Sequence, residues 1–163
     1  MNPNSPSDQP SSSGERSTFR WLWQWFWRIT LVVSIWSLWY CYYVPSNEIA
    51  WANSYASAQK QSQTTGKPIV LYFTGKWCVP CRIMKRNVWA DSEVTKLVND
   101  SYVPVMINVD DPDASETMRH FNVVGPPVVM VADSDGNVMR WRDGGIAKSD
   151  FLELLATSDE SFE

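Results

Sequence analysis

Apolar side chains fall into two regions of different character along the chain. From Trp21 to Val44 most residues are apolar or aromatic, and the 16 residues from 29 to 44 carry no charge. Beyond residue 48 the apolar residues occur in short runs that polar turns separate. The first region predicts one long helix, and the second predicts a folded domain of alternating strands and helices.

The long apolar region has the length and the end pattern of a membrane span. A helix over residues 21–44 would be about 36 Å long, and the hydrocarbon core of a bilayer is about 30 Å thick. Tryptophan and tyrosine residues gather at both ends, as they do at membrane interfaces. Arg16, Arg20 and Arg28 precede most of the span, so we expect a cytoplasmic N-terminus and an extracytoplasmic, periplasmic domain.

A cleaved signal peptide is the alternative interpretation of this region. Ala50-Trp51-Ala52 fits the small-x-small pattern of a cleavage site. Cleavage after Ala52 would remove Ile49 and Trp51, which we expect to form a first short strand. Cys41 lies in the span, where we expect a passive apolar residue, with an intermolecular disulfide as the alternative.

The composition predicts five segments. They are a disordered cytoplasmic tail over 1–20, a transmembrane helix over 21–44, a linker over 45–48, a soluble domain over 49–157 and a tail over 158–163. The formal net charge of −4 comes entirely from the soluble part, which has no basic stripe. Nucleic acid is therefore not an expected partner.

The soluble domain shows the patterns of an α/β fold. With the short strand near residue 50, they predict the order βαβαβ followed by αββα, in which a mixed sheet has helices on both faces. The expected strands cover 69–73, 102–109, 128–132 and 138–142, and the expected helices cover 54–64, 78–89, 91–98, 113–121 and 151–155.

Two cysteines stand where the second strand ends and a helix begins. Cys78 and Cys81 are one helical turn apart, which is within reach of a disulfide. The positive end of a helix favours a thiolate, so Cys78 is the predicted nucleophile and Cys81 the resolving thiol. Pro80 is tolerated in a first helical turn. We expect Trp77 to pack beside the pair and to offer a flat rim to a docking partner.

A zinc site is the other use of a Cys-x-x-Cys motif. It needs two more ligands, and only Cys41 and His120 remain in this chain. Because Cys41 lies in the predicted span and His120 in a predicted surface helix, we expect no metal. No nicotinamide or flavin motif is present in the sequence, so we expect no cofactor either.

A second motif, Gly125-Pro126-Pro127-Val128, precedes the strand that begins at residue 128. A proline at the start of a strand suggests a cis peptide bond. With Trp77-Cys78-Val79-Pro80-Cys81, this motif resembles the thioredoxin superfamily over residues 49–156. The resemblance is strongest to membrane-anchored thioredoxin-like oxidoreductases and to the C-terminal domain of bacterial thiol:disulfide interchange reductases.

The resemblance implies a thioredoxin fold and an extracytoplasmic thiol–disulfide oxidoreductase. Its partners would be protein disulfides and a membrane protein that donates electrons. Pro126, Pro127 and Val128 would bind the substrate strand beside Cys78. We favour a reductant, because the dipeptide between the cysteines lacks the histidine that favours oxidation. The alternatives are a non-catalytic binding or chaperone module and a dedicated cytochrome c maturation reductant.

The chain departs from the family beneath the cysteines. Tyr72 occupies the place of the family's buried aspartate, and Met106 occupies that of its companion lysine. The proton of Cys81 must therefore move through water or through another group.

A proline at position 126 also predicts broader and weaker recognition of peptides, because it has no N–H to donate. The Pro126→Ile variant should therefore have a lower Michaelis constant for a peptide disulfide. Steady-state reduction assays measure this, and an unchanged constant would contradict the prediction.

Overall fold

The computed structural model describes residues 15–156. They divide into two compact units, one ending at Tyr43 and the other beginning at Val44. The first unit is helix α1 (Glu15–Tyr42), whose large apolar side chains from Trp21 onward are exposed. It begins within the segment predicted as a tail and ends before Val44. The rest of that tail, and the tail predicted over 158–163, lie outside the described residues.

Among the helices of residues 15–156, none combines the length and the apolar character that crossing a membrane requires.

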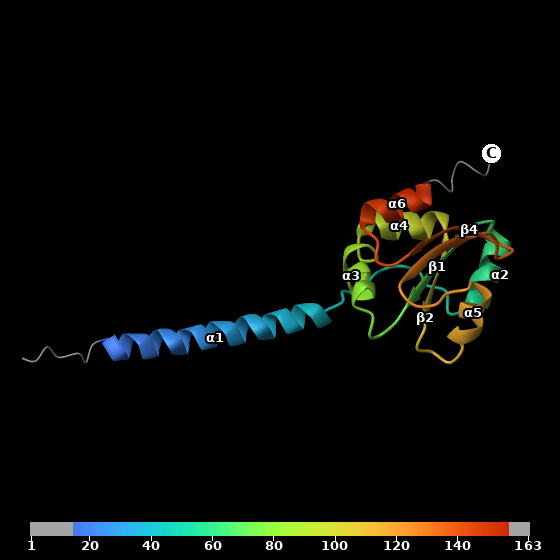
Figure 1. The fold of residues 1–163 in the computed structure, drawn as a ribbon. Coiled ribbons are helices and arrows are strands. Elements are labelled where there is room, and N and C mark those ends of the chain that lie inside the picture. The colour runs from blue at the N-terminus through green and yellow to red at the C-terminus, as the bar shows by residue number, and fades with distance from the viewer. Residues whose placement is uncertain (1–14, 157–163) are drawn as a thin grey trace, which may run out of the picture. The chain divides into compact units, whose positions relative to one another are not determined.

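The second unit consists of a sheet and the helices around it (Figure 1). Its elements, in order, are α2 (Tyr55–Thr65), β1 (Ile69–Thr74), α3 (Val79–Asn87), α4 (Ser92–Ser101), β2 (Val103–Asn108), α5 (Ala114–His120), β3 (Val128–Ala132), β4 (Val138–Asp143) and α6 (Lys148–Ala156). These bounds lie within a few residues of the predicted ones. The α/β class and the mixed sheet are confirmed.

The sheet has the strand order β2-β1-β3-β4. Strand β1 runs parallel to β2 and antiparallel to β3, and β3 forms an antiparallel hairpin with β4. Strand β1 is buried along its whole length, and it leads directly into the loop that carries the cysteines. The central strand therefore fixes the position of the site.

Two hydrophobic cores cover the two faces of the sheet. Side chains alternate along β1, so Val70 and Tyr72 face one side while Leu71 and Phe73 face the other. Helices α3, α4 and α6 pack on the Tyr72 side, and α2 and α5 pack on the Phe73 side (Figure 1). Both cysteines belong to the core on the Tyr72 side.

The predicted first strand does not form. Ala52 makes a single isolated bridge to Val105, while the N–H of Trp51 turns back to the carbonyl of Ile49 at 2.9 Å. The Trp51 ring instead packs edge-on against Trp89, with the centroids 5.1 Å apart. Ile49 is buried as well, so residues 49–52 belong to the folded domain.

Part of the predicted linker is also held on the domain. The Asn47 side chain accepts a hydrogen bond from the Trp51 indole at 2.9 Å, and Asn99 donates to the carbonyl of Glu48 at 3.0 Å. The chain is thus tied to the domain from residue 47, which leaves residues 43–46 between α1 and the first of these contacts.

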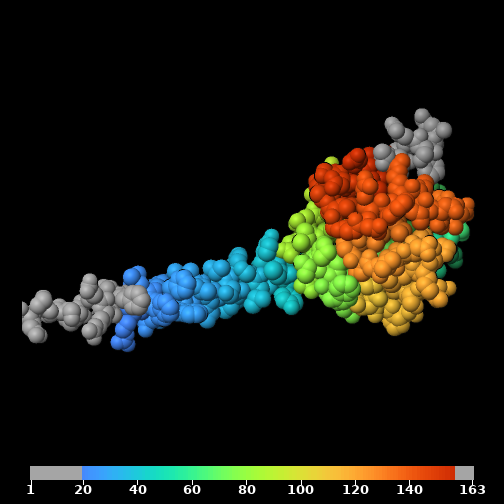
Figure 2. Space-filling model, viewed as in Figure 1, coloured from blue at the N-terminus to red at the C-terminus, as the bar shows by residue number. Residues whose placement is uncertain are grey.

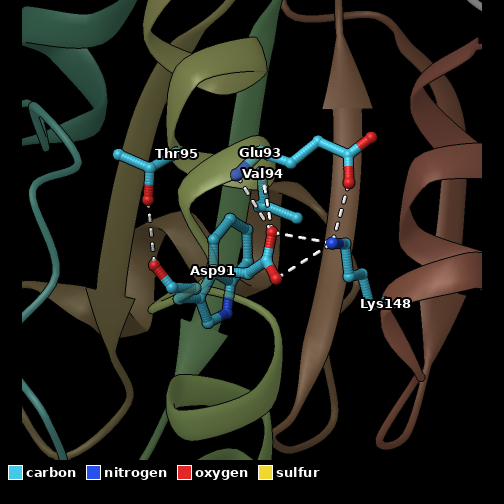
Figure 3. A network of polar contacts seen from close by, with 6 residues as sticks. Asp91, Glu93, Val94, Thr95 and Lys148 are labelled. Carbon is cyan, nitrogen blue, oxygen red and sulfur yellow. Dashed lines mark hydrogen bonds and ion pairs between the residues drawn. The ribbon is translucent and has the colours of Figure 1, made fainter.

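A polar network joins the starts of α4 and α6 (Figure 3). Asp91 caps α4 and accepts the N–H groups of Glu93 and Val94. The Lys148 ammonium lies 2.9 Å from the Asp91 carboxylate and 2.8 Å from that of Glu93. The hydrogen bond from Lys148 holds the pKa of Asp91 below its ordinary value of 3.8, and the carboxylates of Glu93 and Asp91 raise the pKa of Lys148.

Removing the Lys148 ammonium should make the free energy of unfolding depend less on pH in the acidic range. The stabilisation from Asp91 is present above pH 3.8 and is lost as the pH falls through the lower pKa of the folded state. The Lys148→Met variant should therefore unfold at lower urea than the wild type at pH 7, and the difference should shrink below pH 3.8. Lys96→Met, on the exposed side of α4, is the matched control. A deficit of the same size at pH 2.5 would contradict the prediction.

Candidate redox-active site

Cys78 and Cys81 lie at the first turn of α3. Cys78 is the N-cap residue, with an extended backbone, and Cys81 follows within the helix. Their Cα atoms are 5.3 Å apart, and the two residues form a disulfide. The backbone N–H of Cys81 donates to the sulfur of Cys78 at 3.2 Å. Since this N–H and the helix dipole both favour a negative sulfur, the geometry suits a thiolate at Cys78 after reduction.

Both cysteines are buried beside exposed apolar residues. Cys78 is 2% exposed and Cys81 is 0% exposed, whereas their neighbours Trp77 and Val79 are well exposed. The residues around the start of α3 reach the surface of the domain in the green part of Figure 2. Both cysteines therefore lie in the core, and the residues on either side of Cys78 in the sequence expose apolar side chains.

The proline loop and the glycine loop after β4 approach the cysteine loop closely. A Cβ atom at Gly75 would lie 3.3 Å from Pro126 Cγ, and one at Gly145 would lie 3.2 Å from Pro80 Cβ. Both contacts would be tighter than ordinary packing, so a side chain at either glycine would require the neighbouring proline to move by a few tenths of an ångström. The peptide bond between Pro126 and Pro127 is cis, as predicted.

The three residues predicted to bind substrate are not equivalent. Pro126 is half-buried, while the side chains of Pro127 and Val128 are buried. Val128 begins β3 and pairs with Phe73 and Asp143 on either side. The structure therefore leaves Pro126 as the most accessible side chain of the three, and the binding role of all three stays a prediction.

Asp110 is a part of the site that the sequence analysis did not assign. Its carboxylate accepts the backbone N–H of Lys76 at 2.8 Å and the indole N–H of Trp77 at 3.1 Å. Asp110 follows β2, the strand next to β1, so its position beside the cysteine loop follows from the parallel pairing. An aspartate just beyond the neighbouring parallel strand was the available signal.

Tyr72 contacts the resolving cysteine from inside the domain. Its hydroxyl donates to the carbonyl of Cys81 at 3.2 Å. Burial raises the pKa of Tyr72 to about 12, against smaller lowering effects of Thr74 and Trp89. The phenol is therefore neutral throughout the physiological pH range. His120, by contrast, is exposed on α5, which packs on the other face of the sheet.

Basic residues lie on α3 and in the loop before it. The Arg82 guanidinium donates to the carbonyl of Lys76 at 2.9 Å, which ties the helix to the loop before it. Burial, with a further effect of the Arg82 charge, lowers the pKa of Lys85.

The family of the chain follows from a match over residues 50–134 to the family model described as thioredoxin-like. This match covers more than half of the chain. The chain belongs to the thioredoxin-like family. The resemblance inferred from the two motifs is therefore confirmed.

Curated relatives of the chain are named thiol:disulfide interchange proteins. The chain is 28% identical over 104 residues to the thiol:disulfide interchange protein DsbD of Campylobacter jejuni, which covers 63% of this chain and 18% of that protein. It is 29% identical over 100 residues to the protein of the same name from Ralstonia nicotianae, covering 60% and 16%. The chain thus matches less than a fifth of the length of these relatives. The names agree with the prediction of a thiol–disulfide oxidoreductase.

Solved structures share the fold of the second unit. The DsbH oxidoreductase superposes with a TM-score of 0.61 at 23% identity, covering 72% of this chain and 88% of that one. A thioredoxin from Thermus thermophilus gives 0.61 at 24% identity, covering 68% and 87%. The C-terminal domain of DsbD from Neisseria meningitidis, in its oxidised form, gives 0.54 at 24% identity, covering 63% and 90%. A thioredoxin fold is therefore established for this chain.

Removing the Asp110 carboxylate should loosen the loop above the cysteines. We expect the amide of Lys76 to exchange about tenfold faster in Asp110→Ala, because a hydrogen bond to a charged acceptor is lost. Asp110→Asn retains an acceptor oxygen and should change exchange less. Hydrogen–deuterium exchange of the peptide that contains Lys76 measures the effect. Equal protection in the wild type and the alanine variant would show that Asp110 does not hold the loop.

Proposed function

We propose that the protein is an extracytoplasmic thiol–disulfide oxidoreductase that reduces or exchanges disulfides of other proteins, with Cys78 and Cys81 as its catalytic pair. The observation that carries this proposal is the disulfide at the N-terminus of α3, where Cys78 accepts the N–H of Cys81. The exposed side chains of Trp77 and Val79 give a protein partner an apolar surface beside the pair.

The reaction proceeds by two exchanges. The Cys78 thiolate attacks one sulfur of a substrate disulfide, and the other substrate sulfur leaves as a thiolate and takes a proton. Cys81 then attacks the Cys78 sulfur of the mixed disulfide, which releases the second substrate thiol. Two electrons pass from the cysteine pair to the substrate, and the protein is left as the disulfide.

The direction that we favour is reduction. Val79 and Pro80 place no histidine between the cysteines that would stabilise the thiolate further and favour oxidation. Reduction requires electrons, and a membrane protein that carries a dithiol is the expected donor. The predicted substrate contacts are Pro126, Pro127 and Val128.

Helix α1 is the proposed membrane anchor. Residues 29–44 are uncharged, and aromatic residues stand at both ends of the apolar region. Tryptophan and tyrosine lower the mean hydropathy of such a helix although they are favoured at membrane interfaces. The burial of Ile49 and the packing of Trp51 favour retention of the segment over its cleavage after Ala52.

The oxidoreductase proposal predicts a clear difference between cysteine variants. Cys78→Ser should abolish the reduction of insulin disulfides, because the attacking sulfur is lost. Cys81→Ser should instead accumulate a mixed disulfide that a thiol reductant releases. Turbidity and non-reducing mass spectrometry measure the two results. Equal insulin reduction by the wild type and Cys78→Ser would favour a binding or chaperone module.

The anchor proposal predicts the behaviour of α1 in a cell. The full chain should stay with the membrane fraction after alkaline extraction, whereas a chain that begins at residue 46 should be released. Protease added outside the cytoplasmic membrane should digest the domain of the full chain. Release of the full chain by alkali, or recovery of a product that begins at residue 53, would contradict the proposal.

A further inference from the structure

The interior beneath the disulfide holds polar groups that carry no charge. The Tyr72 hydroxyl donates to the carbonyl of Cys81, and Trp89 packs on the Tyr72 ring with the centroids 4.9 Å apart. The Thr74 hydroxyl and the Trp89 indole N–H are buried, and their interaction with the Tyr72 phenol lowers its pKa against the larger effect of burial. These groups therefore lie together on the cysteine side of the sheet.

The fully buried groups include no carboxylate, histidine or lysine. Within residues 20–156, whose side chains the structure describes, the buried polar residues besides the aromatic and cysteine side chains are Ser62 and Thr74. Lys85, four residues beyond Cys81 on α3, is half-buried, and burial lowers the pKa of its ammonium. The Tyr72 phenol holds its own proton at neutral pH, since burial raises its pKa to about 12. A neutral phenol that donates to a carbonyl does not accept a proton from a thiol.

We propose that Tyr72, by occupying the space beneath Cys81 with a neutral phenol, makes the second exchange slow at neutral pH, so that the protein holds its partner in a long-lived mixed disulfide. This inference rests on the proposed oxidoreductase function and concerns its second step. Tyr72 is a positioning residue in this account, because it contacts the backbone of Cys81.

The proton balance of that step explains the delay. The Cys81 thiol must lose a proton before its sulfur attacks Cys78. The bond between Cys78 and the substrate sulfur breaks as the new disulfide forms, and the departing substrate thiolate takes up a proton. Burial disfavours the charged form of a thiol, so few molecules carry a Cys81 thiolate at neutral pH. Without a buried base, the Cys81 proton passes to solvent before the attack, and the departing sulfur takes its proton from solvent.

The consequence is selectivity among partners. A substrate cysteine with a low thiol pKa leaves as a thiolate more readily than a cysteine with a high thiol pKa. A slow resolving thiol makes the lifetime of the mixed disulfide depend on this leaving group. The protein should therefore release partners whose cysteine has a low thiol pKa quickly and retain those whose cysteine has a high thiol pKa.

The test follows the mixed disulfide with glutathione through time. The reduced full chain, with Cys41→Ser to leave only the two site cysteines, is mixed with oxidised glutathione in mild detergent and quenched with acid between pH 6 and 9. Mass spectrometry then measures the fractions of the protein present as the glutathione adduct and as the internal disulfide. We expect the adduct to accumulate near pH 7 and its decay to accelerate about tenfold per pH unit, because the Cys81 thiolate increases by that factor below its pKa.

Three variants separate the phenol from general effects on the fold. Tyr72→Asp supplies a buried carboxylate and should speed decay at pH 7 at least tenfold with a flatter pH profile. Tyr72→Phe should keep the steep profile, because the phenol takes no proton. Tyr102→Phe, which removes a similar hydrogen bond from a buried tyrosine to the carbonyl of Leu155, is the matched control.

The outcomes distinguish this inference from the function on which it rests. A wild-type decay that is independent of pH would overturn the inference, and so would a flat profile in Tyr72→Phe or an unchanged one in a folded Tyr72→Asp. If Tyr72→Asp does not fold, the wild-type and Tyr72→Phe profiles still decide. A reduced wild type that forms no adduct at any pH would instead contradict the oxidoreductase proposal itself.

Discussion

The hydrogen bond from the Cys81 N–H to the Cys78 sulfur is the interaction on which the account depends. It exists because Cys78 occupies the N-cap position, where a side-chain acceptor meets N–H groups that the helix leaves unpaired. Cysteine replaces the usual oxygen acceptor there. The N-terminus of the helix stabilises a negative charge on a sulfur in that position. The Cys78 thiol is therefore expected to lose its proton more readily than a free cysteine.

The rest of the domain holds that turn in place from three directions. Strand β1 is buried along its length and delivers the cysteine loop at a fixed point. Asp110, just beyond the neighbouring strand β2, binds the loop, and Tyr72 binds the carbonyl of Cys81 from within the core. The close approaches of Pro126 to Gly75 and of Gly145 to Pro80 bring two further loops to the same place. Chain segments distant in sequence thus enclose one disulfide.

Local patterns predicted the fold well where one residue type has one physical role. The buried run of β1, the position of Cys78 before α3 and the cis bond at Pro127 all follow from short motifs and agree with the structure. The strand expected at residues 49–51 failed for a tertiary reason. Trp51 packs on Trp89 instead of extending the sheet, and no local pattern contains that contact.

The site itself was only partly accessible to the sequence. The spacing of Cys78 and Cys81 predicts their role. The carboxylate of Asp110 is 33 positions from Trp77 in the sequence, so its hydrogen bond with the Trp77 indole depends on the pairing of β1 with β2. Tyr72 stood out in the sequence as a departure from the family. Its contact with the Cys81 carbonyl depends on the face of β1 that it occupies and on the packing of α3.

The most direct measurement is the pH dependence of alkylation at Cys78. In the Cys41→Ser, Cys81→Ser chain, iodoacetamide can react with this thiol alone, and its rate follows the thiolate fraction. The account predicts a midpoint well below the value of about 8.5 for a free cysteine, because the N-terminus of α3 stabilises the charge. A midpoint at or above 8.5 would contradict it, since the helix would then contribute nothing to the reactivity of the thiol.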